Sequence, residues 1–247
     1  MDEIAIISDI HGNMTALEAV LGDIQSRGIG QIYCLGDLIG KGPHGEEAIK
    51  RIRETCEVVV MGNWDDAIVQ EHDNPYMKWH QQQLSDTSMN YLRSLPFHHD
   101  FYMSGYYMRL YHASAKSVHH RVVPWVHSKE EREAMFEDSP YIEPLVPGQM
   151  PDLIFYGDIH AACTLPVLEK RSIINVGSVG NSLDLPKATY TIIRGKLGTE
   201  TAPFSTELVR LPYDVEHEIQ LAKAAHMPGL EEYALELREG IYRNAKK

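Results

Sequence analysis

The sequence predicts an α/β fold that contains a parallel β-sheet. Two observations over the first sixty residues support this class: short apolar runs alternate with amphipathic helical patterns, and each run ends in a polar or glycine-rich turn. An order of strand, helix, strand, helix and strand is typical of parallel sheets, because parallel strands need long crossover connections. The length of 247 residues and the hydrophobic content of 43% fit one large domain.

The N-terminal elements are the clearest. We expect strands at residues 4–7, 32–35 and 58–61, which are short, continuous apolar runs. Between them, apolar side chains recur at helical spacing over residues 17–24 and 48–52, which predicts two crossover helices.

The middle of the chain is less regular. Residues 70–102 are polar and rich in histidine, and they predict one helix only. Ser128 and Glu131 have the spacing of a capping box, which predicts a helix beginning there. We interpret residues 70–150 as partly an insertion or lid that covers the site, within a single domain of residues 1–247.

Further strands are predicted by short runs rich in apolar and β-branched residues. They are expected at residues 106–111, 153–156, 173–176, 189–194 and 207–211, of which the last two look antiparallel. Two helices follow, and the first is expected to begin near Asp214.

Composition and charge narrow the class of partner. A net charge of -12 argues against nucleic acid and against an anionic membrane surface. No signal-peptide pattern and no apolar run of transmembrane length occur in the sequence, so we expect a cytoplasmic protein. The three cysteines are scattered and are interpreted as small buried hydrophobic residues.

Five of the expected strands end in side chains that can bind a metal. These are Asp9 with His11, Asp37, Asn63, His112, and Asp158 with His160. Ligands of α/β sheets bind at the carboxyl ends of strands. Side chains two positions apart on a strand share a face, so Asp9 and His11 are expected to reach one object. Taken alone, this pair also fits a hydrogen-bonded couple in the core.

The set of oxygen and imidazole ligands suits Mn, Fe or Zn better than a soft metal or calcium. Seven candidate ligands exceed what one tetrahedral ion uses. Two ions that share a bridging carboxylate therefore fit better than a single ion.

The order of these motifs resembles the calcineurin-like metallophosphoesterase superfamily over nearly the whole chain. The motifs are Asp-x-His at 9–11, Gly-Asp-x-x-Gly at 36–40, Gly-Asn-x-Asp at 62–65, the single His112, and Gly-x-x-His at 157–160. The resemblance implies two packed, mainly mixed β-sheets flanked by helices, a four-layer αββα sandwich.

The resemblance also implies which residues act at the site. Asp9, His11, Asp37 and His160 would hold one metal; Asp37, Asn63, His112 and Asp158 would hold the other, with Asp37 bridging. Two divalent ions, Mn or Fe most readily and Zn as an alternative, would clamp phosphate and activate a bridging water, so that Asp9, His11 and Asp37 act through the metals. Lys41 stands where such phosphatases often carry a phosphate-binding Arg.

Two positions depart from the family pattern. Asp158 stands where a His is usual, and three carboxylates against two ions predict a less acidic bound water. The alternative is that Asp158 points away and a water replaces it.

Trp64 stands where many members carry a His that assists the leaving group, so no general-acid His is expected there. Substrates whose leaving group needs no proton are therefore favoured.

Gly-Asn-Trp-Asp at residues 62–65 and the tail motif at 212–223 resemble small bacterial phosphodiesterases that also split diadenosine tetraphosphate asymmetrically. Trp64 is expected either to stack on a base or to pack the wall of the site, and His44 is a further candidate substrate contact.

The predicted activity is hydrolysis of a phosphodiester or dinucleoside polyphosphate. The expected partner is a phosphorylated small molecule or nucleotide, and a homo-oligomer is an open expectation. A Ser/Thr protein phosphatase is the alternative enzyme, and a metal-poor binding scaffold of the same fold is the alternative of another class.

Overall fold

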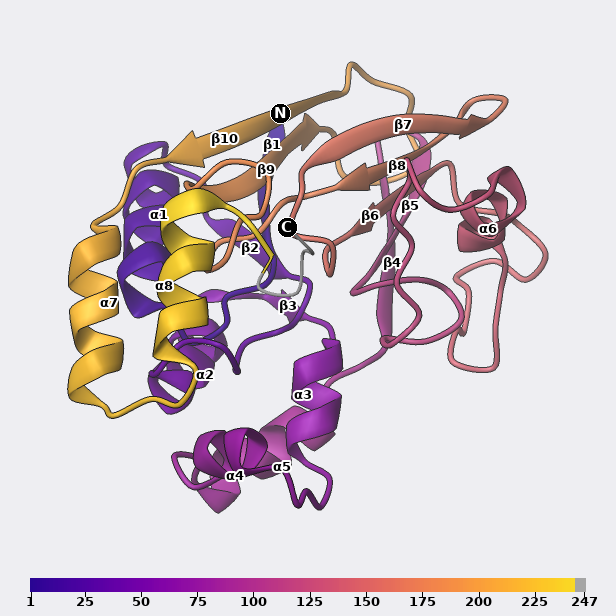
Figure 1. Cartoon of the computed structure of the whole chain (residues 1–247). Helices are drawn as coiled ribbons and strands as arrows, with labels where there is room; N and C mark the ends of the chain where they lie inside the picture. Colours follow the sequence, from indigo (N-terminus) through magenta and orange to yellow (C-terminus); the bar gives the residue numbers. More distant parts are fainter. Residues whose placement is uncertain (243–247) are drawn as a thin grey trace.

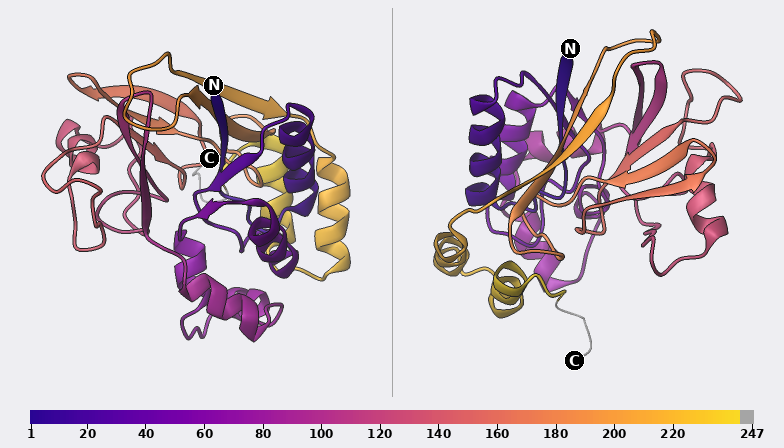
Figure 2. Two further views of the ribbon diagram at one scale, coloured as in Figure 1. Left: turned by 180° about the vertical axis from the view of Figure 1, so that it is seen from behind. Right: turned by 90° about the horizontal axis from the view of Figure 1, so that it is seen from above.

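The computed structural model describes residues 1–242 and consists of two five-stranded sheets packed face to face (Figure 1). Helices cover the outer faces of both sheets, as the two further views make clear (Figure 2). The predicted four-layer arrangement of mixed sheets and helices is confirmed.

The first sheet has the strand order β10-β9-β1-β2-β3. Its strands are β1 (Asp2–Ile7), β2 (Gln31–Cys34), β3 (Val58–Val59), β9 (Ala188–Gly195) and β10 (Ser205–Leu211). Strands β1, β2 and β3 are parallel, and β9 runs antiparallel to both of its neighbours. The crossovers are α1 (Met14–Ser26) and α2 (Gly45–Thr55), both of which the sequence predicts.

Strand β1 explains why its sequence is continuously apolar. Ala5 and Ile7 pack in the core under the helices, whereas Ile4 and Ile6 pack in the core between the two sheets. A strand that is buried on both faces has no solvent side to mark with polar residues.

The second sheet has the order β4-β5-β6-β8-β7. Its strands are β4 (His98–Met103), β5 (Tyr106–Tyr111), β6 (Leu153–Tyr156), β7 (Cys163–Leu168) and β8 (Arg171–Asn175). Strands β5, β6 and β8 are parallel, and the two edge strands are antiparallel. Sequence reasoning missed both edge strands, because β4 begins with the polar residues His-His-Asp and β7 contains Pro166, which is atypical of a strand.

The region of residues 70–150 divides between sheet and covering segments. It contributes β4 and β5 to the second sheet, so that part is not an insertion. Outside the sheet are α4 (Pro75–Gln81), α5 (Asp86–Arg93), α6 (Lys129–Glu133) and the 3-10 helix η1 (Ala134–Phe136). The expected capping box begins α6, where the Ser128 side chain accepts from the Glu131 amide.

Before this region lies α3 (Asn63–Ile68), which the sequence did not predict, and α4 was also missed. Both have seven residues or fewer, too few to display a helical period.

Helices α7 (Val215–Ala224) and α8 (Leu230–Glu239) pack against each other beside α1 (Figure 1). The Asp214 side chain caps α7 by accepting from the His217 amide, as its position predicts. Glu218 of α7 accepts a hydrogen bond from the Thr15 hydroxyl of α1 at 2.6 Å. Within residues 1–242, none of the helices has the length and apolarity needed to cross a bilayer.

Candidate metal centre

The candidate ligands lie in tight turns that follow the carboxyl ends of the parallel strands. Asp9 and His11 come after the end of β1 at Ile7, and both have left-handed backbones, with φ of 55° and 52°. Such a backbone costs about 1–2 kcal/mol for an L-residue, and it is concentrated at functional sites. The predicted reason for their common direction is therefore wrong: the turn, not strand alternation, aims both side chains at one point.

The same backbone conformation recurs around the site. Asp37, Lys41, Asp158 and His160 also have positive φ, between 55° and 62°. Glycines let these turns approach one another, since a Cβ on Gly62 would lie 2.1 Å from the Asp37 amide nitrogen. The absence of a Cβ at this glycine therefore permits the close approach of the backbone.

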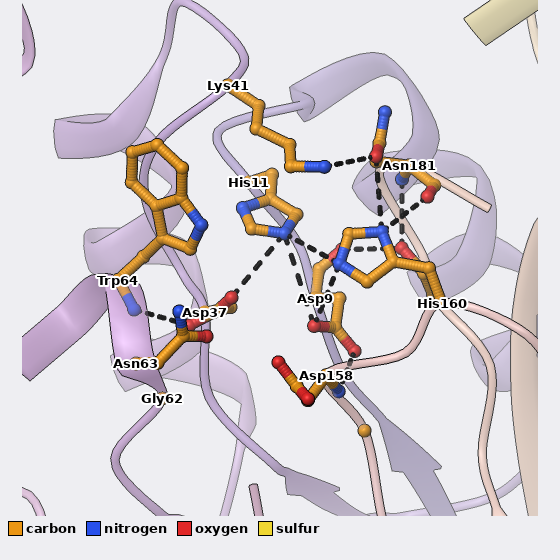
Figure 3. Close-up of polar contacts among 12 residues, drawn as sticks. Asp9, His11, Asp37, Lys41, Gly62, Asn63, Trp64, Asp158, His160 and Asn181 are labelled. Carbon is orange, nitrogen blue, oxygen red and sulfur yellow. Dashed lines mark hydrogen bonds and ion pairs between the residues drawn. The ribbon is translucent and has the colours of Figure 1, made fainter. Parts of the chain in front are cut away.

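The first cluster contains Asp9, His11, Asp37 and His160, all buried, with ligand atoms within 4.8 Å of one another (Figure 3). His11 Nδ1 lies 3.1 Å from the Ile39 carbonyl oxygen, and His160 Nδ1 lies 2.6 Å from the Asn181 carbonyl oxygen. Because carbonyl oxygens only accept, these contacts assign a proton to each Nδ1, so that in the neutral imidazole each Nε2 carries a lone pair.

Those two Nε2 atoms face each other at 3.1 Å. Asp9 Oδ1 lies 3.3 Å from His160 Nε2 and is buried without a hydrogen-bond partner. A cation at this point would satisfy all three groups at once, so the donor set fits a metal ion.

The charges of the first cluster agree with this fit. Burial lowers the pKa of His11 well below its usual value, and His160 and Lys41 lower it further, which keeps the imidazole neutral. Burial by itself would raise the pKa of Asp9, but His160 and the other two histidines outweigh it and hold that pKa well below the usual range. A neutral imidazole and an ionised carboxylate are the forms that bind metals.

The second cluster contains Asp37, Asn63 and His112. His112 Nδ1 donates to the Leu35 carbonyl at 2.8 Å, and Nε2 lies 2.9 Å from Asn63 Oδ1 and 3.4 Å from Asp37 Oδ1. With its oxygen inward, the Asn63 amide meets acceptors only; turned over, its nitrogen would donate to Asp37 and to His112 Nε2. With its oxygen toward the cluster, Asn63 can bind a cation. With its nitrogen toward the cluster, Asn63 hydrogen-bonds to Asp37 and His112, and no cation is needed.

His112 differs from His11 in its protonation. Burial would lower the pKa of His112, but the carboxylates of Asp37, Asp9 and Asp158 raise it to about 10. A proton therefore competes with a cation for this imidazole.

Asp37 joins the two clusters. Its Oδ2 lies 3.5 Å from His11 Nε2, and its Oδ1 faces His112 and accepts from the Trp64 amide at 2.8 Å. One oxygen therefore faces each cluster, as the predicted bridging role requires.

Asp65 holds this bridge in place and was not singled out from the sequence. Its carboxylate accepts from the backbone amides of Asp37, Leu38 and Gly62 at 2.8 to 3.0 Å. Burial and the neighbouring Asp37 raise the pKa of Asp65 to about 7. Its place as the last residue of the Gly-Asn-x-Asp motif was the available signal.

Asp158 has a partner that the sequence did not reveal. Arg121 donates from Nε to Asp158 Oδ2 and from Nη2 to Oδ1, both at 2.9 Å, and from Nη2 also to the Asp158 carbonyl. These hydrogen bonds raise the pKa of Arg121, so the guanidinium stays charged. The negative charge of Asp158 is therefore compensated by the guanidinium of Arg121. The prediction of a less acidic metal-bound water counted only the carboxylates and the two ions, so it left this positive charge out.

A cavity of about 450 Å³ opens over both clusters. It is lined by Lys41, Asn63, Trp64, Ala67, Tyr76, Met77, His119, Arg121, His160 and Tyr242. Of the three predicted substrate contacts, Lys41 and Trp64 line this cavity, whereas His44, before α2, is not among the described residues that do.

Lys41 and Trp64 are both held by other parts of the protein. The Lys41 ammonium donates to Asn181 Oδ1 at 2.7 Å (Figure 3). It also lies 3.6 Å from the buried Glu236 carboxylate of α8. The Trp64 ring packs directly on Gly40 and meets the His11 ring edge-on, with the ring centroids 6.0 Å apart. Trp64 thus forms a wall of the cavity and leaves part of its ring on the cavity side.

Comparison with known proteins shows which family shares these motifs and this fold. The family model described as the calcineurin-like phosphoesterase superfamily domain matches residues 3–196. An uncharacterized protein of Methanocaldococcus jannaschii is 31% identical over 239 residues, which cover 86% of this chain and 88% of that protein.

Two crystal structures share the fold over almost the full length. A metallophosphoesterase from Sphaerobacter thermophilus has a TM-score of 0.73 at 26% identity, covering 97% of this chain and 100% of its own. A hypothetical protein from Pyrococcus horikoshii has a TM-score of 0.75 at 19% identity, covering 98% and 100%. With its ordered motifs, its two mixed sheets and its buried Asp/His cluster, the chain belongs to the calcineurin-like phosphoesterase superfamily.

Proposed function

We propose that the protein is a metal-dependent hydrolase of phosphoester or phosphoanhydride bonds, with two divalent ions held by the two clusters. The observation that carries this proposal is the bridge of Asp37, whose two oxygens face two separate sets of candidate ligands. Mn or Fe suits these ligands best, and Zn is the alternative. When bound, such a pair of ions supplies Lewis acidity toward phosphate oxygens and water.

The chain's own residues would then orient the substrate. Lys41, held by Asn181, and Arg121, held by Asp158, bring two cationic groups to the cavity. Both groups also face carboxylates, Glu236 and Asp158, so what they offer an anionic substrate is N–H donors at the cavity rather than a net positive charge. At position 64 the indole can donate a hydrogen bond but cannot titrate, so it offers no proton to a leaving group.

These features support a dinucleoside polyphosphate, or a phosphodiester whose leaving group needs no proton, as the substrate. Trp64 and Tyr76 line the cavity with aromatic surface on which a nucleobase can stack. A phosphoserine phosphatase is favoured less, because an alkoxide leaving group needs a proton donor. A metal-free scaffold is also favoured less, since it would leave the facing lone pairs of His11 and His160 without a partner.

A substrate panel tests the proposal. The protein is loaded with Mn, Fe or Zn, and turnover of bis-p-nitrophenyl phosphate, diadenosine tetraphosphate and a phosphopeptide is compared. We expect the first two to be hydrolysed faster than the peptide, and Asp37→Asn to abolish turnover. Preference for the phosphopeptide would favour the protein phosphatase, and no turnover with any metal would favour the scaffold.

A further inference from the structure

The pairing of Asp158 with Arg121 assigns roles to two residues of the proposed active site. We propose that Asp158 is a positioning residue that fixes Arg121, and that the Arg121 guanidinium, rather than an ion at Asp158, contacts a phosphate oxygen of the bound ligand. This inference rests on the proposed function, because it concerns the same cavity.

The hydrogen bonds of Asp158 show that its carboxylate is already engaged. Each of its oxygens accepts a charged N–H of Arg121 at 2.9 Å, in the fork geometry that gives the strongest carboxylate pairs. A third bond, from Nη2 to the Asp158 carbonyl at 3.0 Å, fixes the guanidinium against the backbone as well. Asp158 is buried, so water does little to weaken these contacts.

Asp158 also lies apart from the atoms that converge on a single point. Among residues 1–242, the buried group whose ligand atoms lie within 4.8 Å of one another is Asp9, His11, Asp37 and His160, without Asp158. Asp158 Oδ1 lies 4.0 Å from His112 Nε2, whereas Asn63 Oδ1 lies 2.9 Å from the same atom. Because Asp9 Oδ1 lies equally far, 4.0 Å, from His11 Nε2, this distance alone does not exclude an ion at Asp158; the fork with Arg121, which occupies both carboxylate oxygens, is what argues against one.

Arg121 has donors left over for a ligand. A guanidinium carries five N–H groups, and Asp158 engages those of Nε and Nη2. Nη1 makes no hydrogen bond to any residue in the described range 1–242. The Arg121 side chain is 47% exposed and lines the cavity beside Asn63 and His160, one residue from each cluster.

The contrast with Lys41 shows why Arg121 is the better placed cation. The Lys41 side chain is 7% exposed, and its ammonium lies between Asn181 and the Glu236 carboxylate. Arg121 is about half exposed, and its planar fork matches two oxygens of a phosphate group. A phosphate seated over the clusters therefore meets Arg121 at the open side of the cavity.

Two measurements on the Mn-loaded full chain test the proposal without relying on turnover: bound metal per chain by elemental analysis, and the Kd of inorganic phosphate by calorimetry. The variants are Arg121→Gln, Asp158→Asn and the double variant. His112→Ala is the control for loss of a metal ligand. Arg51→Gln is the matched control, because Arg51 makes a similar fork with Glu18 on the surface, away from the cavity.

We expect Arg121→Gln and Asp158→Asn each to raise the phosphate Kd about tenfold or more, the loss typical of a hydrogen bond to a charged group. Bound metal should equal that of the wild type in both variants. The double variant should bind phosphate no more weakly than Arg121→Gln, because the two residues act as one unit. Arg121→Lys should recover part of the affinity, since it restores the charge but not the fork.

Three results would overturn the proposal. One is an Asp158→Asn variant that loses metal as His112→Ala does, which would make Asp158 a ligand. Another is an unchanged phosphate Kd in Arg121→Gln, and the third is no phosphate binding by the wild-type holoprotein. Neither readout needs hydrolysis, so a protein that binds phosphate as described but cleaves no ester would disprove the proposed function and leave this inference standing.

Discussion

The two clusters on either side of Asp37 differ in how completely the protein can satisfy them by itself. In the first, the lone pairs of His11 and His160 and a bare oxygen of Asp9 face one another, and a cation is what joins them. In the second, either a turned Asn63 amide that donates to a neutral His112, or a proton on His112 Nε2 that points at Asn63 Oδ1, can take the place of a cation. The two clusters share Asp37 and lie side by side, but they are not equivalent. We expect the first cluster to bind its ion more tightly than the second.

The largest effect is expected from Asp37→Asn, because this change removes one charge from both clusters. Hydrolysis should fall by more than the ~100-fold that is typical of residues that only support a ligand, and bound metal should fall as well. Elemental analysis and turnover of bis-p-nitrophenyl phosphate measure the two effects. Asp73→Asn, at an exposed carboxylate paired with Lys78, is the control. Full metal content in Asp37→Asn would show that Asp37 does not bridge.

The difference between the clusters is tested next, by His160→Ala and His112→Ala. We expect His160→Ala to weaken the tighter step of a Mn titration by roughly 100-fold or more, and His112→Ala to weaken only the weaker step. Calorimetric titration of the metal-free protein measures both steps. If His112→Ala weakens the tighter step instead, the proposed order of affinities is reversed.

A smaller effect is expected at Asp65, which supports the bridge from behind. Asn at this position keeps one carbonyl oxygen for three backbone amides, so at least one amide loses its partner. Unfolding free energy should drop by about 1–3 kcal/mol, and metal affinity by roughly 10- to 100-fold.

Asp66→Asn is the neighbouring control for this change. Asp66 pairs with the half-exposed His119, and such a surface pair contributes about 1 kcal/mol or less. Urea denaturation and Mn titration would separate the two variants; equal losses would mean that Asp65 has no special role.

The smallest effect is expected at Trp64, which touches both sides of the bridge through its amide and its ring. Trp64→His would place a titratable donor in the cavity, and we expect turnover of a phosphopeptide to rise about tenfold relative to bis-p-nitrophenyl phosphate. Trp64→Phe removes the indole without adding a donor and should leave that ratio unchanged. A ratio that rises equally in both variants would point to space in the cavity as the cause.

Much of the fold follows from local patterns in the sequence. The strands buried on both faces, the helices that cross between them and the capping residues at 128 and 214 each have a local signature, and each is present. Elements without such a signature were missed: the edge strand β4 is partly polar, the edge strand β7 contains Pro166, and α3 and α4 are too short to show a period.

The candidate site follows the same division. The sequence by itself determined which side chains stand at the ends of parallel strands, because each parallel sheet places the carboxyl ends of its strands at one edge. Only the tertiary structure decided how they meet: left-handed turns aim Asp9 and His11, and Arg121 reaches Asp158 across 37 residues of chain. Backbone strain and pairs between distant segments leave no periodic trace in a sequence, since they depend on how the two sheets are packed.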